Sequence, residues 1–249
     1  MTTAIGGITW NGQNSADLGL AITYDSSQLA GGLFSSTLTQ IGGQSAAVIQ
    51  PNNRFDNVSQ VFNFTTYRPM QQADIAPLHR SVEDWLFAGA DLSQYQRLAF
   101  DGYPDYYWQA VPIALTPFSV SKGAVTFSVT FSCLPYAYET GGDQYQAVSA
   151  GLVINNTTRL YEARPLWHVK GTGNGSFVLN GVTYNFLGLN GDLYIDSDTE
   201  EVYDAANNYQ PGMVQFDNYV FPVLAIGKNT FGTLTNITLE VMPRWRTLL

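Results

Sequence analysis

A run of carboxylates between residues 192 and 204 is the strongest sign of chemistry in the sequence. Its members are Asp192, Asp196, Asp198, Glu200, Glu201 and Asp204. Alternating acidic side chains, as found from Asp196 onward, are how a calcium-binding loop begins. Such a loop also needs Gly at its sixth position and a bidentate Glu at its twelfth. The sequence has Glu201 and Asn207 at those positions. The pattern therefore predicts a solvated turn between two strands.

Residues that serve metal binding or nucleophilic catalysis are few and isolated. The chain has two histidines, His79 and His168, and neither belongs to an H-E-x-x-H motif or a Cys/His ligand set. Cys133 ends a strand-like run and is predicted to be a buried, small apolar residue. There is no G-x-S-x-G elbow. We therefore predict no catalytic residue, no cofactor and no metal site, and a protein that is not an enzyme.

The glycine-rich segment 171–176 resembles a phosphate-binding loop in composition. The third position of the fingerprint is Ser176, however, and β-forming residues follow where a helix should begin. Without a helix N-terminus the segment has neither the dipole nor the stacked amides that hold a phosphate. It is not expected to bind nucleotides.

Aromatic side chains offer a different kind of binding chemistry. Tyr103, Tyr106, Tyr107 and Trp108 lie close together in the sequence, and Trp245 is a further candidate. Such rings could stack on sugars, although aromatic clusters are more common in cores and interfaces. A carbohydrate-binding, lectin-like module is therefore an alternative function. A cell-wall hydrolase component is a third class, because paired carboxylates are invisible in a sequence.

The composition favours a globular protein rich in β-strands. Of 249 residues, 45% are apolar, 14% are aromatic and 12% are charged, where about a quarter charged is typical. The 23 glycines, 15 tyrosines and 14 phenylalanines suit strands better than helices. The net charge of −9 argues against direct DNA binding and against an anionic membrane surface. The single cysteine fits folding in a reducing cytoplasm.

Short strands dominate the predicted elements. Residues 125–131 alternate apolar and polar side chains, the pattern of a half-buried strand. Asn180-Gly181 between β-forming residues predicts a tight hairpin. Gly141-Gly142 is the best candidate for a linker. We expect a mainly β protein in which residues 1–138 form a β-sandwich with one helix and a hairpin arm, and residues 139–249 form a second β-sandwich.

One segment is predicted to be an α-helix. Its apolar face consists of Ile75, Leu78, Val82, Trp85 and Leu86, which recur at helical spacing. Asp74 is predicted to cap the N-terminus, Pro77 to lie in the first turn, and Gly89 to follow the C-terminus.

An uncharged segment extends from Ser26 to Asn53, where a chain of this composition would place about three charges. Gly42-Gly43 in its middle predicts the turn of a hairpin arm. Because interface cores are depleted in charge, we predict that the arm contacts another protein surface; the alternative is a loop over its own core. The predicted interface residues are Leu33, Phe34, Leu38, Ile41, Val48 and Ile49.

A series of short motifs follows along nearly the whole chain. In order they are Asp84-Trp85-Leu86, Tyr95-Gln96-Arg97-Leu98, Asp101-Gly102-Tyr103-Pro104-Asp105-Tyr106-Tyr107-Trp108, Cys133-Leu134-Pro135-Tyr136, Glu162-Ala163-Arg164-Pro165, Gly171-Thr172-Gly173, Tyr194-Ile195-Asp196-Ser197-Asp198, Val202-Tyr203-Asp204, Gly227-Lys228-Asn229 and Pro243-Arg244-Trp245-Arg246. This order resembles that of the distal tail protein of long-tailed, siphovirus-type bacteriophages that infect Gram-positive hosts.

The resemblance implies a virion structural protein at the phage tail tip, made in the cytoplasm of the host bacterium. It implies a homohexamer ring formed by the N-terminal domain, in which the arm of one subunit embraces the next. The C-terminal domain would be galectin-like. Implied partners are the tail tube protein, the tape-measure and tail-tip proteins, and the receptor-binding or baseplate proteins used in host adsorption. DNA would pass through the channel of the ring.

The charge pattern predicts that the protein does not hold DNA, even as its conduit. The 11 Lys and Arg are scattered and outnumbered by 20 Asp and Glu, so the surface should repel phosphate. In a gel-shift measurement at low salt we expect no retention of duplex DNA by micromolar protein. Retention in that range would contradict the prediction and indicate a basic patch.

Overall fold

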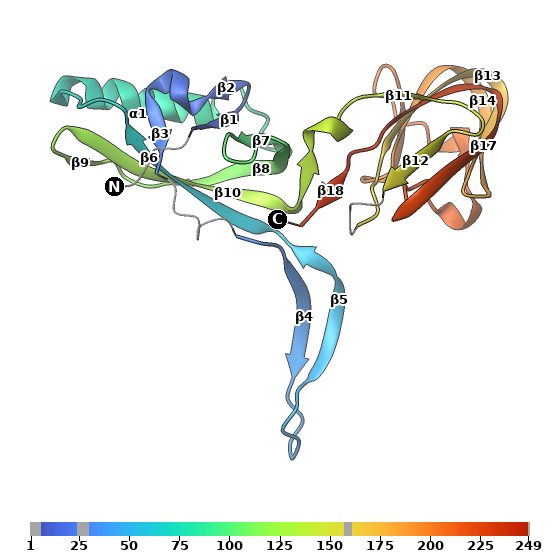
Figure 1. Cartoon of the computed structure of the whole chain (residues 1–249), viewed down its shortest axis with the longest axis horizontal. Helices are drawn as coiled ribbons and strands as arrows, with labels where there is room; N and C mark the ends of the chain where they lie inside the picture. The colour runs from blue at the N-terminus through green and yellow to red at the C-terminus, as the bar shows by residue number, and fades with distance from the viewer. Residues whose placement is uncertain (1–5, 24–29, 157–160, 249) are drawn as a thin grey trace. The chain divides into compact units, whose positions relative to one another are not determined.

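The computed structural model describes residues 6–23, 30–156 and 161–248 and is mainly β (Figure 1). Its contacts divide the chain into two compact units. The first comprises the described residues up to Ala137 together with Leu248, and the second extends from Tyr138 to Thr247. The curled sheets form sandwich-like units, so the expected mainly β fold class is confirmed.

The first unit is built on one sheet with the strand order β2-β1-β7-β8-β10-β6-β3, and β9 pairs with β10. The strands are β1 (Ile8–Trp10), β2 (Gln13–Asn14), β3 (Leu20–Ile22), β6 (Val58–Thr66), β7 (Gln96–Phe100), β8 (Tyr106–Leu115), β9 (Ser119–Ser121) and β10 (Ala124–Glu139). A 3-10 turn, η1 (Ser15–Leu18), precedes β3. The predicted alternation in 125–131 is confirmed, because its odd-numbered residues are buried in β10.

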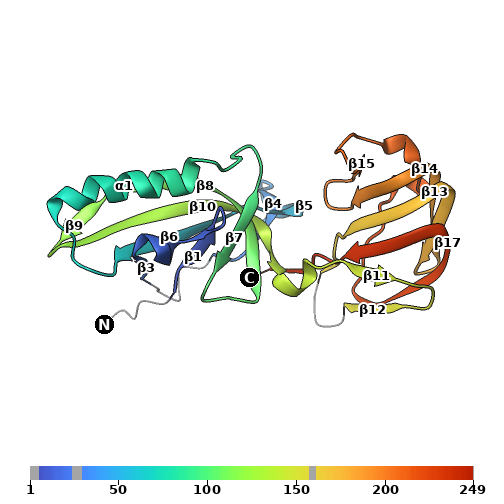
Figure 2. The same ribbon diagram turned by 90° about the horizontal axis from the view of Figure 1, so that it is seen from above.

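Helix α1 (Gln72–Phe87) covers one face of this sheet (Figures 1 and 2). Its predicted apolar face is confirmed, since Leu78, Val82, Trp85 and Leu86 are buried. Gly89 follows the helix with φ 75°, as expected.

The predicted start of α1 is wrong by three residues, because the N-cap is Gln71 rather than Asp74. The extended residue at the N-cap is Gln71, which makes no side-chain capping hydrogen bond. Asp74 therefore lies in the first turn, where its carboxylate faces the positive end of the helix dipole. Pro77 lies inside the helix and deprives it of one backbone donor.

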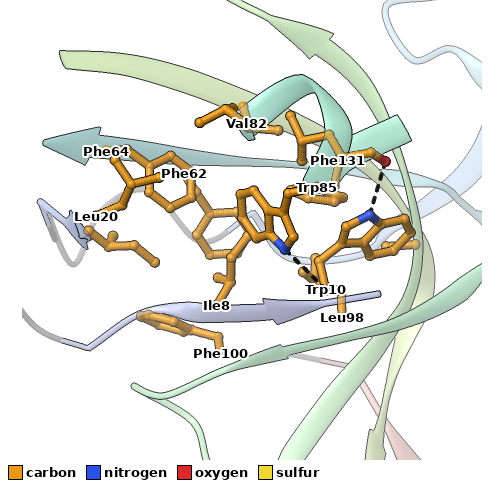
Figure 3. Close-up of a cluster of buried hydrophobic side chains, with 14 of the residues drawn as sticks. Ile8, Trp10, Leu20, Phe62, Phe64, Val82, Trp85, Leu98, Phe100 and Phe131 are labelled. Carbon is orange, nitrogen blue, oxygen red and sulfur yellow. Dashed lines mark hydrogen bonds between the residues drawn. The ribbon is translucent and has the colours of Figure 1, made fainter. Parts of the chain in front are cut away.

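Two tryptophans connect α1 to the sheet through mutual hydrogen bonds (Figure 3). The indole Nε1 of Trp10 donates to the Leu86 carbonyl at 3.1 Å. The indole Nε1 of Trp85 donates to the carbonyls of Trp10 and Gln13, each at 3.1 Å. Both side chains are buried, so these bonds satisfy donors that would otherwise be costly to bury.

The second unit is built on a sheet with the strand order β11-β17-β13-β14-β15; β12 pairs with β17 and β16 with β14. The strands of this sheet are β11 (Gln146–Val148), β12 (Val153–Asn156), β13 (Leu166–Leu179), β14 (Val182–Asp196), β15 (Glu201–Asp204), β16 (Val214–Gln215) and β17 (Gly227–Met242). The short β18 (Arg246–Thr247) follows β17 in the chain and is not a strand of this sheet. The 3-10 turns are η2 (Thr140–Gly142), η3 (Pro211–Met213) and η4 (Asp217–Tyr219).

Local features of the second unit follow the sequence closely. Leu179 pairs with Val182 across Asn180-Gly181, both of which have positive φ, so the predicted hairpin is confirmed. Strand β13 continues through segment 171–176, where a phosphate loop would need a helix. The predicted linker residue Gly142 is buried in η2. It packs so closely on Trp245 that a Cβ atom would lie 2.7 Å from the Trp245 backbone nitrogen, so the position has no room for a side chain.

Trp167 organises the core of this unit. It is fully buried, and its Nε1 donates to Ser197 Oγ at 3.0 Å and to the Pro222 carbonyl at 3.1 Å. Ser197 Oγ donates to the same carbonyl at 2.7 Å. The indole thus connects β13 to the turn after β14 and to the loop that precedes β17.

The hydrogen bond from Trp10 to α1 predicts that loss of the indole N–H destabilises the fold more than the small change in side-chain volume would. Trp10→Phe keeps an aromatic ring but leaves the Leu86 carbonyl without its indole donor, which should cost about 1–3 kcal/mol in the free energy of unfolding. Chemical denaturation with fluorescence detection measures this. Tyr67→Phe, a change at an exposed ring, is the control. Equal stabilities of the two variants would contradict the role given to the indole bond.

Candidate functional site

The arm, residues 33–56, is a two-stranded antiparallel hairpin made of β4 (Leu33–Thr39) and β5 (Val48–Asp56). These strands pair with each other and with no other described strand. At the tip, the Gln44 amide donates to the Ile41 carbonyl at 3.1 Å across Gly42-Gly43, and Gly43 has φ 83°. The hairpin expected to turn at these glycines is therefore present. Residues 26–29 of the uncharged segment lie outside the described residues.

All six predicted interface residues are exposed apolar side chains. Leu33, Ile49 and Leu38 have exposed fractions of 75%, 65% and 64%. Phe34, Ile41 and Val48 are exposed as well. Within the single chain these side chains do not cover the core of the first unit.

The strand register groups several apolar side chains of the arm. Leu38 lies opposite Ile49, and Phe34 lies opposite Phe55. Directly opposite residues in an antiparallel pair share one face of the ribbon. The rings of Phe34 and Phe55 pack edge to face, with centroids 5.5 Å apart. The arm therefore presents paired apolar side chains rather than single scattered ones.

Polar and aromatic contacts fix the base of the arm. The Gln60 side chain is buried and acts like a strand partner: its Nε2 donates to the Ala30 carbonyl at 2.8 Å, and its Oε1 accepts from the Ala30 amide at 3.1 Å. The Phe55 ring packs edge to face on Tyr136 of β10, with centroids 5.9 Å apart. Asn52 Nδ2 donates to Ser35 Oγ at 2.9 Å. The arm is thus held at its base while its apolar side chains are left exposed.

The carboxylates of the acidic run are engaged by neighbouring protein groups. Arg244 Nη1 lies 2.8 Å from both Asp196 carboxylate oxygens. Arg246 Nη1 lies 3.5 Å from Asp198 Oδ1. Asp196 and Glu201 face each other across the β14–β15 turn, so the predicted turn between two strands is confirmed. In the described residues no group of three or more His, Cys, Asp and Glu is placed to hold a metal ion.

Asp204 organises the loop that follows β15. Its Oδ1 accepts from the amides of Ala206 and Asn208, each at 2.9 Å, and its Oδ2 accepts from Asn208 Nδ2 at 3.0 Å and from Gln210 Nε2 at 3.2 Å. These bonds, above all those from the Asn208 side chain, lower the pKa of Asp204 to about 2.

His168 lies between two carboxylates on the central strands of the second unit. Its Nε2 is 2.8 Å from Asp192 Oδ1 and its Nδ1 is 2.9 Å from Glu240 Oε2. The ring stacks on Tyr194, with centroids 4.7 Å apart. The hydrogen bond from His168 is the main reason that the pKa of Asp192 is lowered. Sequence reasoning missed this cluster, because its members come from β13, β14 and β17 and meet only through the register.

Of the remaining candidates, the aromatic rings and Cys133 lie in or against the two cores, with Tyr103 and Tyr106 only partly buried, whereas His79 is half-exposed on α1. Tyr107 and Trp108 are buried in the first unit and Trp245 in the second, so these rings are not available to stack on a sugar. Cys133 is fully buried, and this burial raises the pKa of its thiol to about 12. His79 lies on α1 beside Glu83, with Nδ1 3.3 Å from Glu83 Oε2.

As far as the chain is described, no helix has both the length and the apolar character needed to cross a bilayer. No protein-family model matches the sequence, and no curated protein matches it.

The fold described above, two mainly β units with one described α-helix and an exposed hairpin, matches that of a phage adsorption hub protein. One solved structure that matches is the crystal structure of SPP1 Dit (gp 19.1), with a TM-score of 0.72 over 98% of this chain and 99% of that one. That protein is described as a paradigm of the hub adsorption apparatus in phages infecting Gram-positive hosts. The identity is 13%, so the likeness is one of fold. This likeness of fold confirms, for the fold alone, the resemblance to phage distal tail proteins that the sequence predicted.

The hydrogen bonds to Asp204 predict a loss of stability in acid. A carboxyl whose pKa is lowered by folding stabilises the native state above its unfolded pKa of about 3.9, and this contribution disappears as the pH falls through the folded value, here about 2. The difference in unfolding free energy between wild type and Asp204→Asn should therefore shrink between pH 4 and pH 2. Denaturant titrations at several pH values measure it.

Asn208→Ala is the matched variant, because it removes a donor and leaves the carboxylate in place. It should weaken the same pH dependence. A difference between wild type and Asp204→Asn that stays constant down to pH 2 would exclude this role for the carboxylate.

Proposed function

We propose that this protein is the structural hub of a phage tail tip, where it forms a hexameric ring that joins the tail tube to the host-adsorption apparatus. The observation that carries the proposal is the likeness to the SPP1 Dit hub protein over nearly the whole length of both chains. The role is structural rather than catalytic and is located in the virion.

The arm is the part of the molecule that would build the ring. A two-stranded ribbon has no second layer in which to bury its side chains, and an isolated hairpin is marginally stable in water. Burial of Leu33, Leu38 and Ile49 against another surface would stabilise the complex by roughly 1.5–3 kcal/mol of free energy for each side chain, before the costs of association. We infer that this surface belongs to the next copy of the chain.

Binding of the arm to the next copy would also allow the assembly to close into a ring. The arm of one copy would bind a different surface of the next copy, so the interface is heterologous. Heterologous contacts either close into a ring or extend without limit. A ring leaves a central channel, and subunits with a net charge of −9 suit a channel through which DNA passes without being held.

The proposed partners are those of a tail-tip hub: the tail tube protein on one side, and tape-measure, tail-tip, receptor-binding or baseplate proteins on the other. We also propose that residues 1–138 and 139–249 are separate domains, the first ring-forming and the second galectin-like. Two separate clusters of buried side chains support this division, one in each unit.

Charges placed on the arm should abolish the ring without unfolding the subunit. In the double variant Leu38→Glu/Ile49→Lys, opposite charges replace two apolar residues that face each other, so the hairpin keeps a favourable cross-strand pair. Six copies of the 27.4 kDa chain give about 164 kDa. Light scattering should find that mass for the wild type and about 27 kDa for the variant, with unchanged melting temperatures.

The control is Val182→Lys/Ile226→Glu, which makes the same charge changes at exposed apolar positions of the second unit. It should leave the mass unchanged. A ring that survives the arm variant, or a wild type that stays monomeric at all concentrations, would refute the role of the arm. A variant with a lower melting temperature and unchanged mass would show that these side chains stabilise the single subunit rather than the assembly.

A further inference from the structure

The second unit contains a pocket that the proposed hub function does not use. Its volume is about 570 Å³, and it is lined by the turn before β15 and by the loops between β15 and β17. A pocket of this size is typical of sites for small molecules. All of its lining residues belong to the second unit.

Aromatic rings form the base and the rim of this pocket. Phe216 is buried and is held by Tyr184 and Phe221, with ring centroids 5.3 and 5.5 Å away. Tyr209 and Tyr219 line the same pocket but are exposed, Tyr219 to 92%. Two exposed tyrosines beside a fixed aromatic base offer flat apolar faces to a ligand.

The loop that carries Tyr209 is held by contacts with β15 and with the turn that follows it. Tyr209 forms a β-bridge with Tyr203, and the amide of Gln210 donates to the Val202 carbonyl at 2.7 Å. The hydrogen bonds to Asp204 fix the preceding turn. A rigid site loses less entropy when it binds a ligand.

Tyr219 has an unusual backbone conformation. It and Asn218 both have positive φ, 58° and 55°. A bulky residue such as Tyr rarely adopts this region, and strained residues of this kind concentrate at functional sites. The strain is compatible with the turn in which the Tyr219 amide donates to the Phe216 carbonyl at 3.1 Å.

The polar groups of the pocket define the kind of ligand. Glu200, Asp217, Asn218 and Gln215 supply carboxylate and amide groups. Among the residues that line the pocket, all of them described, there is no Lys, Arg or His. Phosphate and other anions therefore have no cation to bind, whereas hydroxyl groups can donate to the carboxylates and amide oxygens.

We propose that this pocket binds a neutral saccharide. Sugar rings present apolar C–H faces that pack on aromatic rings, here Tyr209 and Tyr219, and hydroxyl groups that hydrogen-bond to Glu200, Asp217 and Gln215. The proposal does not depend on the arm or on the ring, because the pocket lies within one unit of one chain.

Isothermal titration of the full-length protein with four neutral tetrasaccharides, chitotetraose, cellotetraose, maltotetraose and β-1,4-galactotetraose, tests the proposal. At least one should bind with saturation and a dissociation constant below about 1 mM. Tyr219→Ala and Tyr209→Ala should each weaken that binding at least tenfold, and Tyr219→Phe should retain it. Val153→Ala, at an exposed position of the same unit that does not line the pocket, is the control.

The proposal is overturned if none of the four sugars binds, or if binding survives both tyrosine-to-alanine changes. Spermidine and a glycerol-phosphate oligomer are included as charged probes. Binding of spermidine that is lost in Glu200→Gln, without sugar binding, would show a site for cations instead. Tyrosine-dependent binding of the phosphate oligomer would refute the charge argument. None of these results bears on the mass of the assembly, which tests the hub function separately.

Discussion

Each unit is organised by the need of a buried indole N–H for an acceptor. Trp10 and Trp85 meet this need by bonding to carbonyls of each other's elements, which fixes α1 on the sheet. Trp167 meets it by bonding to Ser197 and to the Pro222 carbonyl. The second arrangement extends beyond the core, because Pro222 ends the loop that carries Phe216 and Tyr219. Trp167 in β13 is thus hydrogen-bonded to the residue that follows Phe221, one of the residues lining the pocket.

The arm differs from the two cores in that its apolar side chains are exposed. The two cores bury aromatic side chains against a second layer, whereas β4 and β5 pair only with each other in the described chain and leave Leu38 and Ile49 exposed. The arm carries charge only near its base, at Arg54 and Asp56, where Gln60 and Phe55 also anchor it to the rest of the unit. In the proposed ring, binding and folding would thus be tasks of different parts of the first unit.

Features encoded within a few residues were predictable from the sequence. Asn180-Gly181 forms its hairpin, the alternation in 125–131 gives a half-buried strand, and Gly42-Gly43 turns the arm. Features that depend on register were not predictable. His168 meets Asp192 and Glu240 only because three strands align. The pocket likewise joins Glu200 to Tyr219 across the loops of the second unit. Alternation reveals which face a residue occupies, but not its neighbours on adjacent strands.

The predicted start of the helix is wrong for a local reason. Asp74 is a residue type that often caps helices, but here it lies inside the first turn and Gln71 is the N-cap.

The burial of Cys133 has a consequence for the proposed role in a particle that leaves the host cell. The chain contains one cysteine, and in the folded state its thiol is enclosed and remains protonated. A folded copy therefore has no sulfur with which to form a disulfide after release into oxidising surroundings, whereas an unfolded copy exposes a reactive thiol. In the proposed assembly, oxidative cross-linking would then be confined to damaged copies, and correctly folded copies would be held to their neighbours by noncovalent contacts alone.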